Sequence, residues 1–262
     1  TMGADYYDYL IAANGMIPEK NHKYFSEKIV YLPTYQVNDS KETLPENLFT
    51  REDLGLPKDS FVFCCFNNTY KITPIVFDSW ARILNRVEKS VMMIYVSNKL
   101  AEKNLIKEIK LRGIDPARLI FGTKLKRNEY LDRYRSADLF LDTFPYNAGT
   151  TASDALKMGL PILTLNGNSF NSKEAANIIS AVNLSEMIAT SQEEYESLAV
   201  ELANNPMKYR TIKDKLVDNL SDAPLYNTRL FAKNIESAYK TMFDRYHKGL
   251  DHDHIHVKNI NS

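Results

Sequence analysis

Residues 142–154 read Asp-Thr-Phe-Pro-Tyr-Asn-Ala-Gly-Thr-Thr-Ala-Ser-Asp, and this stretch decides the fold class. The apolar run 139–141 precedes it, and its last part opens a helix-like segment, 152–158. This order predicts a buried strand, a turn of small residues and a helix. Such a turn gathers unpaired backbone N–H groups and the positive end of the helix dipole. The stretch therefore predicts an anion site, for which phosphate is well suited.

The turn also carries residues that suit a nucleotide. Gly149 lets the backbone approach a ligand closely, and the hydroxyls of Thr150 and Thr151 add hydrogen-bond donors. Asp154 follows one helical turn later, where its carboxylate would hold ribose hydroxyls. The alternative is a capped helix that binds no ligand.

The rest of the chain from residue 61 onward alternates short apolar runs with periodic segments. The runs predict strands at 61–66, 91–96, 118–121, 138–142 and 161–165. The periodic segments predict helices at 73–87, 99–112 and 127–135, and then at 171–181, 191–204, 206–219 and 227–245. This series predicts an α/β fold, in which helices cover both faces of a parallel sheet. Such sheets bind ligands at the C-terminal ends of their strands, where the turn after Asp142 lies.

A second strand-to-helix turn, 66–74, reads Phe-Asn-Asn-Thr-Tyr-Lys-Ile-Thr-Pro and follows the first strand of this series. Thr73 suits the N-cap of the next helix and Pro74 its first position. We expect Lys71 at the same edge of the sheet as the threonine turn. Its ammonium would offset the negative charge on a leaving diphosphate without a metal. The alternative is an ordinary exposed lysine.

Composition excludes several classes of function. The chain has 262 residues with 33 basic and 33 acidic side chains, so its net charge gives no reason to expect a nucleic-acid or membrane-surface partner. It shows no apolar run that would span a bilayer, and we expect no signal peptide. Cys64 and Cys65 are adjacent in a strand-like run, so their side chains point to opposite faces and cannot form an ordinary disulfide. We therefore expect a cytoplasmic protein.

Histidines are absent from the central α/β region, which excludes a Ser-His-Asp or Cys-His site there. The segment 251–253 reads Asp-His-Asp and formally matches an Asp-x-Asp metal motif. It follows the last predicted helix rather than a strand, within a polar terminal segment. We predict a solvated tail there and no metal site.

Taken together, the motifs resemble glycosyltransferase family 41, the O-linked N-acetylglucosamine transferases and SPINDLY-like enzymes, in its bacterial form. The matching segments are 26–33, 66–74, 118–121, 137–143, 145–156, 159–161 and 224–228. They spread from about residue 1 to 245 and resemble the C-terminal half of the catalytic region. Residues 1–5 resemble a stretch deep inside the first catalytic domain, so most of that domain is expected to be missing.

The resemblance implies a GT-B fold, in which two Rossmann-like domains hold a sugar nucleotide between them. The implied organisation is a remnant of the first catalytic domain at 1–45, a linker at 46–59, a nucleotide-sugar-binding domain at 60–226, a crossing helix at 227–246 and a flexible tail at 247–262. We expect the crossing helix to pack on residues 1–40 or on another copy of the chain.

The resemblance also assigns roles to the two turns. It implies that Lys71 is catalytic and contacts the diphosphate, that Thr150 and Thr151 hold phosphate oxygens, and that Asp154 binds the ribose. Asn68 stands where the family often has a glutamine near the phosphates. The family works without a divalent metal.

Three positions depart from the family pattern. Arg127 stands where the family often places a lysine close to the base. Tyr130 stands where a histidine usually packs on uracil, and its ring can still stack. Ala13 replaces a usual aspartate.

The implied function is the donor-binding half of an inverting glycosyltransferase that moves a sugar to Ser or Thr of a protein. UDP-N-acetylglucosamine is the expected donor, with UDP-glucose and GDP-fucose as alternatives, and no cofactor is needed. The expected partners are the nucleoside diphosphate sugar and a protein or peptide acceptor, and a homo-oligomer stays open. We expect this chain alone to bind nucleotide without transferring sugar. The other readings are a catalytically silent nucleotide-binding or scaffolding domain and a sugar-nucleotide epimerase of GT-B fold.

Overall fold

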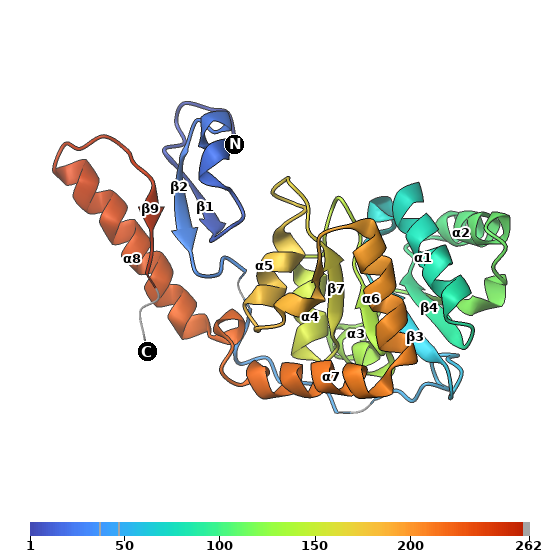
Figure 1. The fold of residues 1–262 in the computed structure, drawn as a ribbon. Helices are drawn as coiled ribbons and strands as arrows, with labels where there is room; N and C mark the ends of the chain where they lie inside the picture. Colours follow the sequence, from blue (N-terminus) through green and yellow to red (C-terminus); the bar gives the residue numbers. More distant parts are fainter. Residues whose placement is uncertain (37, 47, 259–262) are drawn as a thin grey trace. The chain divides into compact units, whose positions relative to one another are not determined.

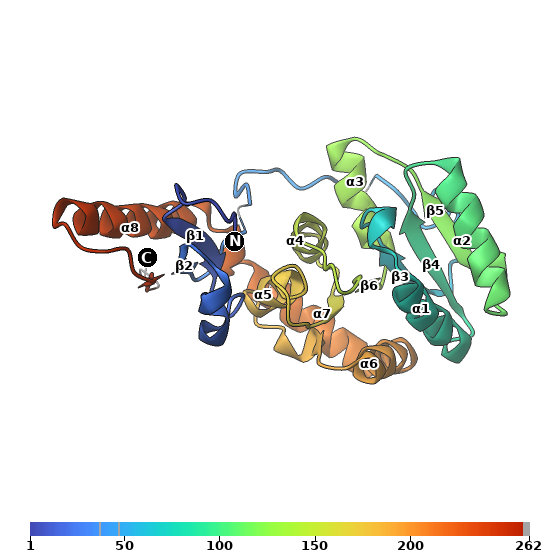
Figure 2. The same cartoon turned by 90° about the horizontal axis from the view of Figure 1, so that it is seen from above.

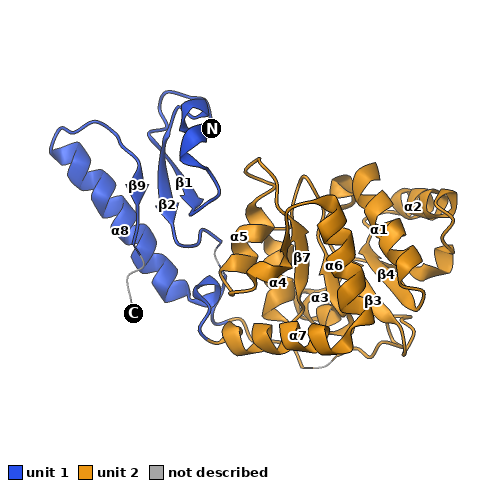
Figure 3. Ribbon diagram, in the orientation of Figure 1, with its two compact units in different colours: residues 1–41, 222–262 blue, residues 42–221 orange. Residues whose placement is uncertain are grey.

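The computed structural model describes residues 1–36, 38–46 and 48–258, and the chain divides into two compact units (Figure 3). Unit 1 combines residues 1–41 with residues 222–262, and unit 2 comprises residues 42–221. None of the helices within the described ranges is long and apolar enough to cross a membrane.

Unit 2 is built on a six-stranded sheet in which every pair of neighbouring strands is parallel (Figure 1). Its strands are β3 (Phe61–Cys65), β4 (Ser90–Tyr95), β5 (Leu119–Gly122), β6 (Leu139–Leu141), β7 (Ile162–Leu165) and β8 (Ile188–Ala189). Their spatial order is β5-β4-β3-β6-β7-β8. The predicted α/β class with a Rossmann-like parallel sheet is confirmed, and β8 is an addition to the predicted strands.

Helices cover both faces of this sheet. They are α1 (Pro74–Arg86), α2 (Lys99–Leu111), α3 (Arg127–Arg133), α4 (Thr150–Lys157), α5 (Glu174–Ser180), α6 (Gln192–Asn204) and α7 (Pro206–Leu220). Four short 3-10 turns lie between them: η2 (Thr69–Lys71), η3 (Pro116–Arg118), η4 (Tyr134–Ser136) and η5 (Ser185–Met187). In Figure 2, α3 and α4 lie on one side of the sheet, and α1 and α6 lie on the other. A parallel sheet needs this double cover because both of its faces are apolar.

The packing of α1 against α6 fixes the end of β6. The indole Nε1 of Trp80 in α1 donates to the hydroxyl of Tyr195 in α6 at 3.2 Å. That hydroxyl in turn donates to the carbonyl oxygen of Asp142 at 2.9 Å, directly after β6. Both aromatic side chains are buried, so a rigid core supports the loop that follows β6.

Unit 1 contains a three-stranded parallel sheet of order β1-β2-β9. Its elements are β1 (Tyr9–Ala13), η1 (Glu19–Tyr24), β2 (Lys28–Leu32), η6 (Pro224–Tyr226), α8 (Thr228–His247) and β9 (Ile255–His256). Ala238 of α8 is buried against Val30 and Leu32 of β2, and Ile235 and Met242 pack on the same cluster. The expectation that residues 227–246 pack on residues 1–40 is therefore confirmed.

The prediction of a flexible tail at 247–262 is wrong for its middle part. β9 pairs with β2, and Ile255 and Val257 are buried in the core of unit 1. The backbone N–H of Ile29 also donates to Nδ1 of His254 at 2.8 Å. The cause is an alternation of polar and apolar residues at 254–257, which suits a short half-buried strand. Residues 259–262 lie outside the described part of the chain.

The stretch 46–59, predicted as a linker, belongs to unit 2. The backbone N–H groups of Leu48 and Phe49 both donate to Oδ2 of Asp132, at 2.8 and 2.9 Å. Arg51 forms an ion pair with Asp138 at 2.7 Å. Two carboxylates of the α/β unit therefore fasten a segment whose polar composition and turn residues suggested an independent linker.

Candidate functional site

Two loops meet at the carboxyl edge of the unit 2 sheet. One loop, 66–73, follows β3, and the other, 142–149, follows β6, its neighbour in the sheet. The strand order reverses at this pair, because β4 lies on the far side of β3 and β7 on the far side of β6. Ligands of doubly wound sheets bind at this kind of switch point. Both sequence-predicted turns therefore lie where such a sheet offers its binding site.

The side chain of Lys71 joins the two loops. Its Nζ donates to the backbone carbonyl of Asn147 at 2.8 Å. The same ammonium lies 3.8 Å from the ring centroid of Tyr146, at a cation–π distance. The structure thus brings Lys71 to the turn that leads into Thr150, as the sequence predicted. The sequence reasoning did not single out Tyr146, because an exposed tyrosine in a loop gives no pattern.

Asn67 ties the first turn of α4 to the same place. It is buried, and its Nδ2 donates to Asp142 Oδ1 at 3.1 Å and to the hydroxyl of Thr143 at 2.8 Å. The hydroxyl of Thr151 donates to Asn67 Oδ1. Thr151 therefore locks α4 to the β3 loop. The sequence feature that could have indicated this role of Asn67 is its position as a polar residue directly after a predicted buried strand.

Asp142 is the fully buried centre of the β6–α4 loop. Besides Asn67, its carboxylate accepts hydrogen bonds from the backbone N–H groups of Thr143 and Ala148, both at 2.8 Å, and from the hydroxyl of Thr164 at 2.7 Å. Burial raises the pKa of Asp142 to about 6, although these hydrogen bonds oppose the shift. The carboxylate oxygens of Asp142, as acceptors of these hydrogen bonds, hold the loop in the shape that brings α4 to the carboxyl edge of the sheet.

The N-terminal end of α4 begins with Gly149 as its N-cap. A Cβ atom at this position would lie only 2.2 Å from Oε1 of Glu174, so any larger residue would force the Glu174 side chain to move. Thr150 and Asn68 are exposed at this edge.

Asp154 and Arg127 form a bidentate pair. The two terminal nitrogens of Arg127 donate to Asp154 Oδ2 and Oδ1 at 2.8 and 2.7 Å. Arg127 also donates to Glu42, which accepts a further ion pair from Lys157 at 2.7 Å. Asp154, which was expected at the ribose, and Arg127, which was expected near the base, thus lie together. Glu42 binds Arg127 from a distant part of the sequence, and no local pattern indicated this contact.

Tyr130 completes the group contributed by α3. Its ring centroid lies 5.6 Å from the guanidinium of Arg127, and its hydroxyl is 2.6 Å from that of Tyr134. Burial raises the pKa of the Tyr130 phenol above its usual range, and the charge of Asp154 adds to this. The phenol therefore stays neutral and is hydrogen-bonded to the hydroxyl of Tyr134.

The network around Glu42 leads to a prediction about pH. Hydrogen bonds, first from Arg127 and then from Lys157, hold the pKa of Glu42 at about 2, below its ordinary 4.5. A lowered pKa in the folded state means stability that is present above pH 4.5 and lost as the pH falls toward 2. Glu42→Gln should lower the free energy of unfolding by about 1–3 kcal/mol at pH 7.

Denaturant unfolding of wild type and variant at several pH values measures this effect. The difference should shrink steadily below pH 4.5. Glu193→Gln, which removes an exposed carboxylate of α6, should change stability by less than about 0.5 kcal/mol. A Glu42→Gln penalty that is the same at pH 7 and pH 3 would contradict the assignment.

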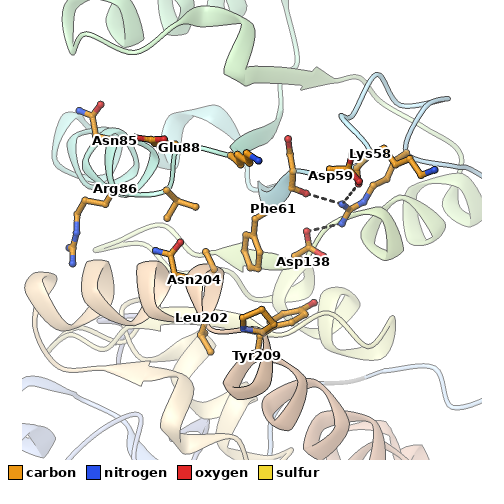
Figure 4. A pocket seen from close by; sticks show the side chains of 16 residues that line it. Lys58, Asp59, Phe61, Asn85, Arg86, Glu88, Asp138, Leu202, Asn204 and Tyr209 are labelled. Atoms are coloured by element: carbon orange, nitrogen blue, oxygen red, sulfur yellow. Dashed lines mark hydrogen bonds and ion pairs between the residues drawn. The ribbon is translucent and has the colours of Figure 1, made fainter.

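Two pockets help to locate the site. One of about 720 Å³ is lined by residues that include Arg51, Lys58, Phe61 and Tyr209 (Figure 4). Phe61 is the first residue of β3, so this pocket opens at the amino edge of the sheet, away from the predicted residues. A second pocket of about 560 Å³ lies beside the β6–α4 loop, with Pro145 in its lining. The chemistry and the sheet topology both favour the carboxyl edge.

Comparisons with known proteins agree with this geometry. A family model described as Glycosyl transferase family 41 matches residues 40–235. A probable UDP-N-acetylglucosamine–peptide N-acetylglucosaminyltransferase SEC of Arabidopsis thaliana is 34% identical over 98% of this chain. A UDP-N-acetylglucosamine–peptide N-acetylglucosaminyltransferase of Caenorhabditis elegans is 32% identical over 82% of the chain. The matches span only 27% and 19% of the lengths of these two relatives.

Solved structures show the same fold. A mutant O-GlcNAc transferase of Thermobaculum terrenum superposes with a TM-score of 0.77 at 24% identity, over 90% of this chain and 45% of that one. Sucrose-phosphate synthase from Thermosynechococcus elongatus gives a TM-score of 0.64 at 14% identity, over 90% of this chain and 58% of that one. The α/β fold of this chain is therefore shared with both of these enzymes.

Proposed function

Because the chain belongs to glycosyltransferase family 41, we propose that it is the donor-binding part of an inverting glycosyltransferase. The enzyme moves a sugar from a nucleoside diphosphate sugar, UDP-N-acetylglucosamine in the first instance, to a Ser or Thr of a protein. The activities for which the two relatives are named support this donor and acceptor. The observation that carries the proposal is the contact of Lys71 with the β6–α4 loop at the switch point of the sheet.

The proposed diphosphate lies between the ammonium of Lys71 and the first turn of α4. In the reaction, the acceptor hydroxyl attacks the anomeric carbon from the face opposite the phosphate. The bond between that carbon and the phosphate oxygen breaks, and the nucleoside diphosphate leaves with the electron pair. Lys71 and the backbone N–H groups of α4 stabilise the charge that develops on it. We assign the general base that takes the hydroxyl proton to the rest of a longer protein or to the substrate.

The nucleoside is proposed to lie over α3. Arg127 pairs with both oxygens of the buried Asp154, and this pair is proposed to hold the ribose hydroxyls. Tyr130 offers its ring to the base, and Asn68 lies at the phosphate end. A metal is not needed in this proposal, because Lys71 supplies positive charge at the leaving group. A cytoplasmic setting belongs to the proposal too, supported by two free, buried cysteines, Cys64 and Cys65.

Calorimetric titration of the chain with UDP and with GDP tests the proposal. Lys71→Ala should weaken binding of the preferred nucleotide by about 1.5–3 kcal/mol, the range for hydrogen bonds to charged groups. Lys89→Ala is the matched control, because Lys89 directly precedes β4 at the amino edge of the sheet. Equal affinity of the wild type and of Lys71→Ala for the nucleotide would contradict the proposed site. The same titration decides between a uridine and a guanosine donor.

A further inference from the structure

A carboxylate lies at the end of α4 that is proposed to hold the diphosphate. Glu174 is the first residue of α5 and is half-buried. A Cβ atom at Gly149 would meet Glu174 Oε1 at 2.2 Å, Cδ at 2.8 Å and Oε2 at 3.3 Å. The whole carboxylate therefore lies against the backbone of the residue that caps α4.

The charge of this carboxylate also acts on Tyr146, whose ring holds Lys71. Burial raises the pKa of Tyr146, and the nearby charges of Tyr70 and Glu174 add to that shift. Tyr146 is the ring on which the Lys71 ammonium rests. Glu174 is thus a negative group that lies against the end of α4, the first of the two proposed anion-binding features.

We propose that Glu174 is a specificity-determining residue that makes the site prefer a nucleoside diphosphate sugar over the free nucleoside diphosphate. This inference rests on the proposed function. In the sugar-bearing donor, the terminal phosphate is a diester with one negative charge. In the free nucleoside diphosphate it is a monoester, whose second pKa is about 6, so it carries close to two charges at pH 7.

In the proposed arrangement the terminal phosphate lies at the end of α4 beside Glu174, and it is this phosphate that carries the extra charge of the free nucleotide. Two like charges a few ångströms apart repel, most strongly where water is partly excluded. The donor avoids this repulsion and brings sugar hydroxyls, which can donate to a carboxylate. Glu174 therefore penalises the product of transfer more than the donor, and favours product release.

Titrations of the chain with matched pairs of ligands test this inference. The pairs are UDP with UDP-N-acetylglucosamine and GDP with GDP-fucose, measured at pH 7.5. Glu174→Gln keeps the size of the side chain and removes its charge. It should tighten binding of the free nucleotide about tenfold and of the sugar-bearing partner less than about threefold. Glu174→Ala should give the same change in preference, because the charge and not the amide causes it.

Two controls sharpen the result. Glu88→Gln removes an exposed carboxylate at the amino edge of the sheet and should leave the preference unchanged. At pH 5.5, where the monoester is partly protonated, the advantage of Glu174→Gln for the free nucleotide should shrink.

Three outcomes would overturn the inference while leaving the proposed function intact, provided that Lys71→Ala still weakens binding. They are equal tightening of both ligands, weakening of the sugar-bearing ligand alone, and no change in either. Absence of nucleotide binding by wild type and by every Glu174 variant would overturn the proposed function, and this inference with it.

Discussion

Sugar transfer by a longer protein that contains this chain and a complete first catalytic domain is expected to fall about 10²–10³-fold when Lys71 is replaced by alanine. The ammonium of Lys71 is already held at the carboxyl edge, 2.8 Å from the carbonyl of Asn147 and against the ring of Tyr146. A preorganised cation stabilises a leaving diphosphate without having to be reoriented during the reaction. Its loss should therefore lower kcat and not only weaken donor binding.

A radiolabelled-sugar transfer assay measures this effect, with Lys89→Ala as the control of equal charge change. The 262-residue chain tested alone should bind nucleotide without transferring sugar. The reason is that transfer needs donor and acceptor held with reacting atoms about 3–3.5 Å apart, between two domains. Robust turnover by the chain alone would refute this argument. A longer protein that binds UDP or GDP sugars but never turns over would favour the silent-domain reading.

Replacing Asp142 by alanine should lower the free energy of unfolding by about 3 kcal/mol. The variant leaves the buried amide of Asn67, the hydroxyl of Thr164 and two backbone N–H groups without their acceptor. The pKa of Asp142 is raised to about 6 from 3.8, so ionisation opposes folding. The stability that this group contributes to the wild type is thus fully present below pH 3.8 and is lost as the pH rises through 6. The free energy of unfolding of the variant should not show this decrease with pH.

Denaturant unfolding of wild type and Asp142→Ala between pH 4 and pH 7.5 measures both effects. Asp214→Ala is the control, because this exposed aspartate of α7 makes only a 3.6 Å contact with Arg210. It should change stability by less than about 0.5 kcal/mol. A stable Asp142→Ala protein with the wild-type pH profile would show that Asp142 does not organise the loop.

Local patterns were sufficient to predict five of the six strands of the unit 2 sheet, all except β8, and the loops at its carboxyl edge. The apolar runs at 61–66 and 138–142 became β3 and β6, and the residues after them became the two loops that Lys71 connects. A strand, a small-residue turn and a helix leave a signature within about fifteen residues, so such a unit can be read without knowing the rest of the fold.

Contacts between distant parts of the chain could not be predicted in this way. Glu42 meets Arg127 across 85 positions of sequence, and Glu174 meets Gly149 only because α5 returns to the end of α4. Both carboxylates looked like ordinary surface charges. β9 was missed because two paired residues are too few to mark a strand within a polar segment.

A crystal structure of the chain with bound UDP, or with GDP if that nucleotide binds more tightly, would show whether the nucleotide occupies the carboxyl edge of the sheet. We expect the diphosphate within hydrogen-bonding distance of Lys71 Nζ and of the backbone N–H groups that open α4, with the ribose at Asp154. Nucleotide bound instead in the pocket at the amino edge, among Arg51, Lys58 and Tyr209, would contradict it.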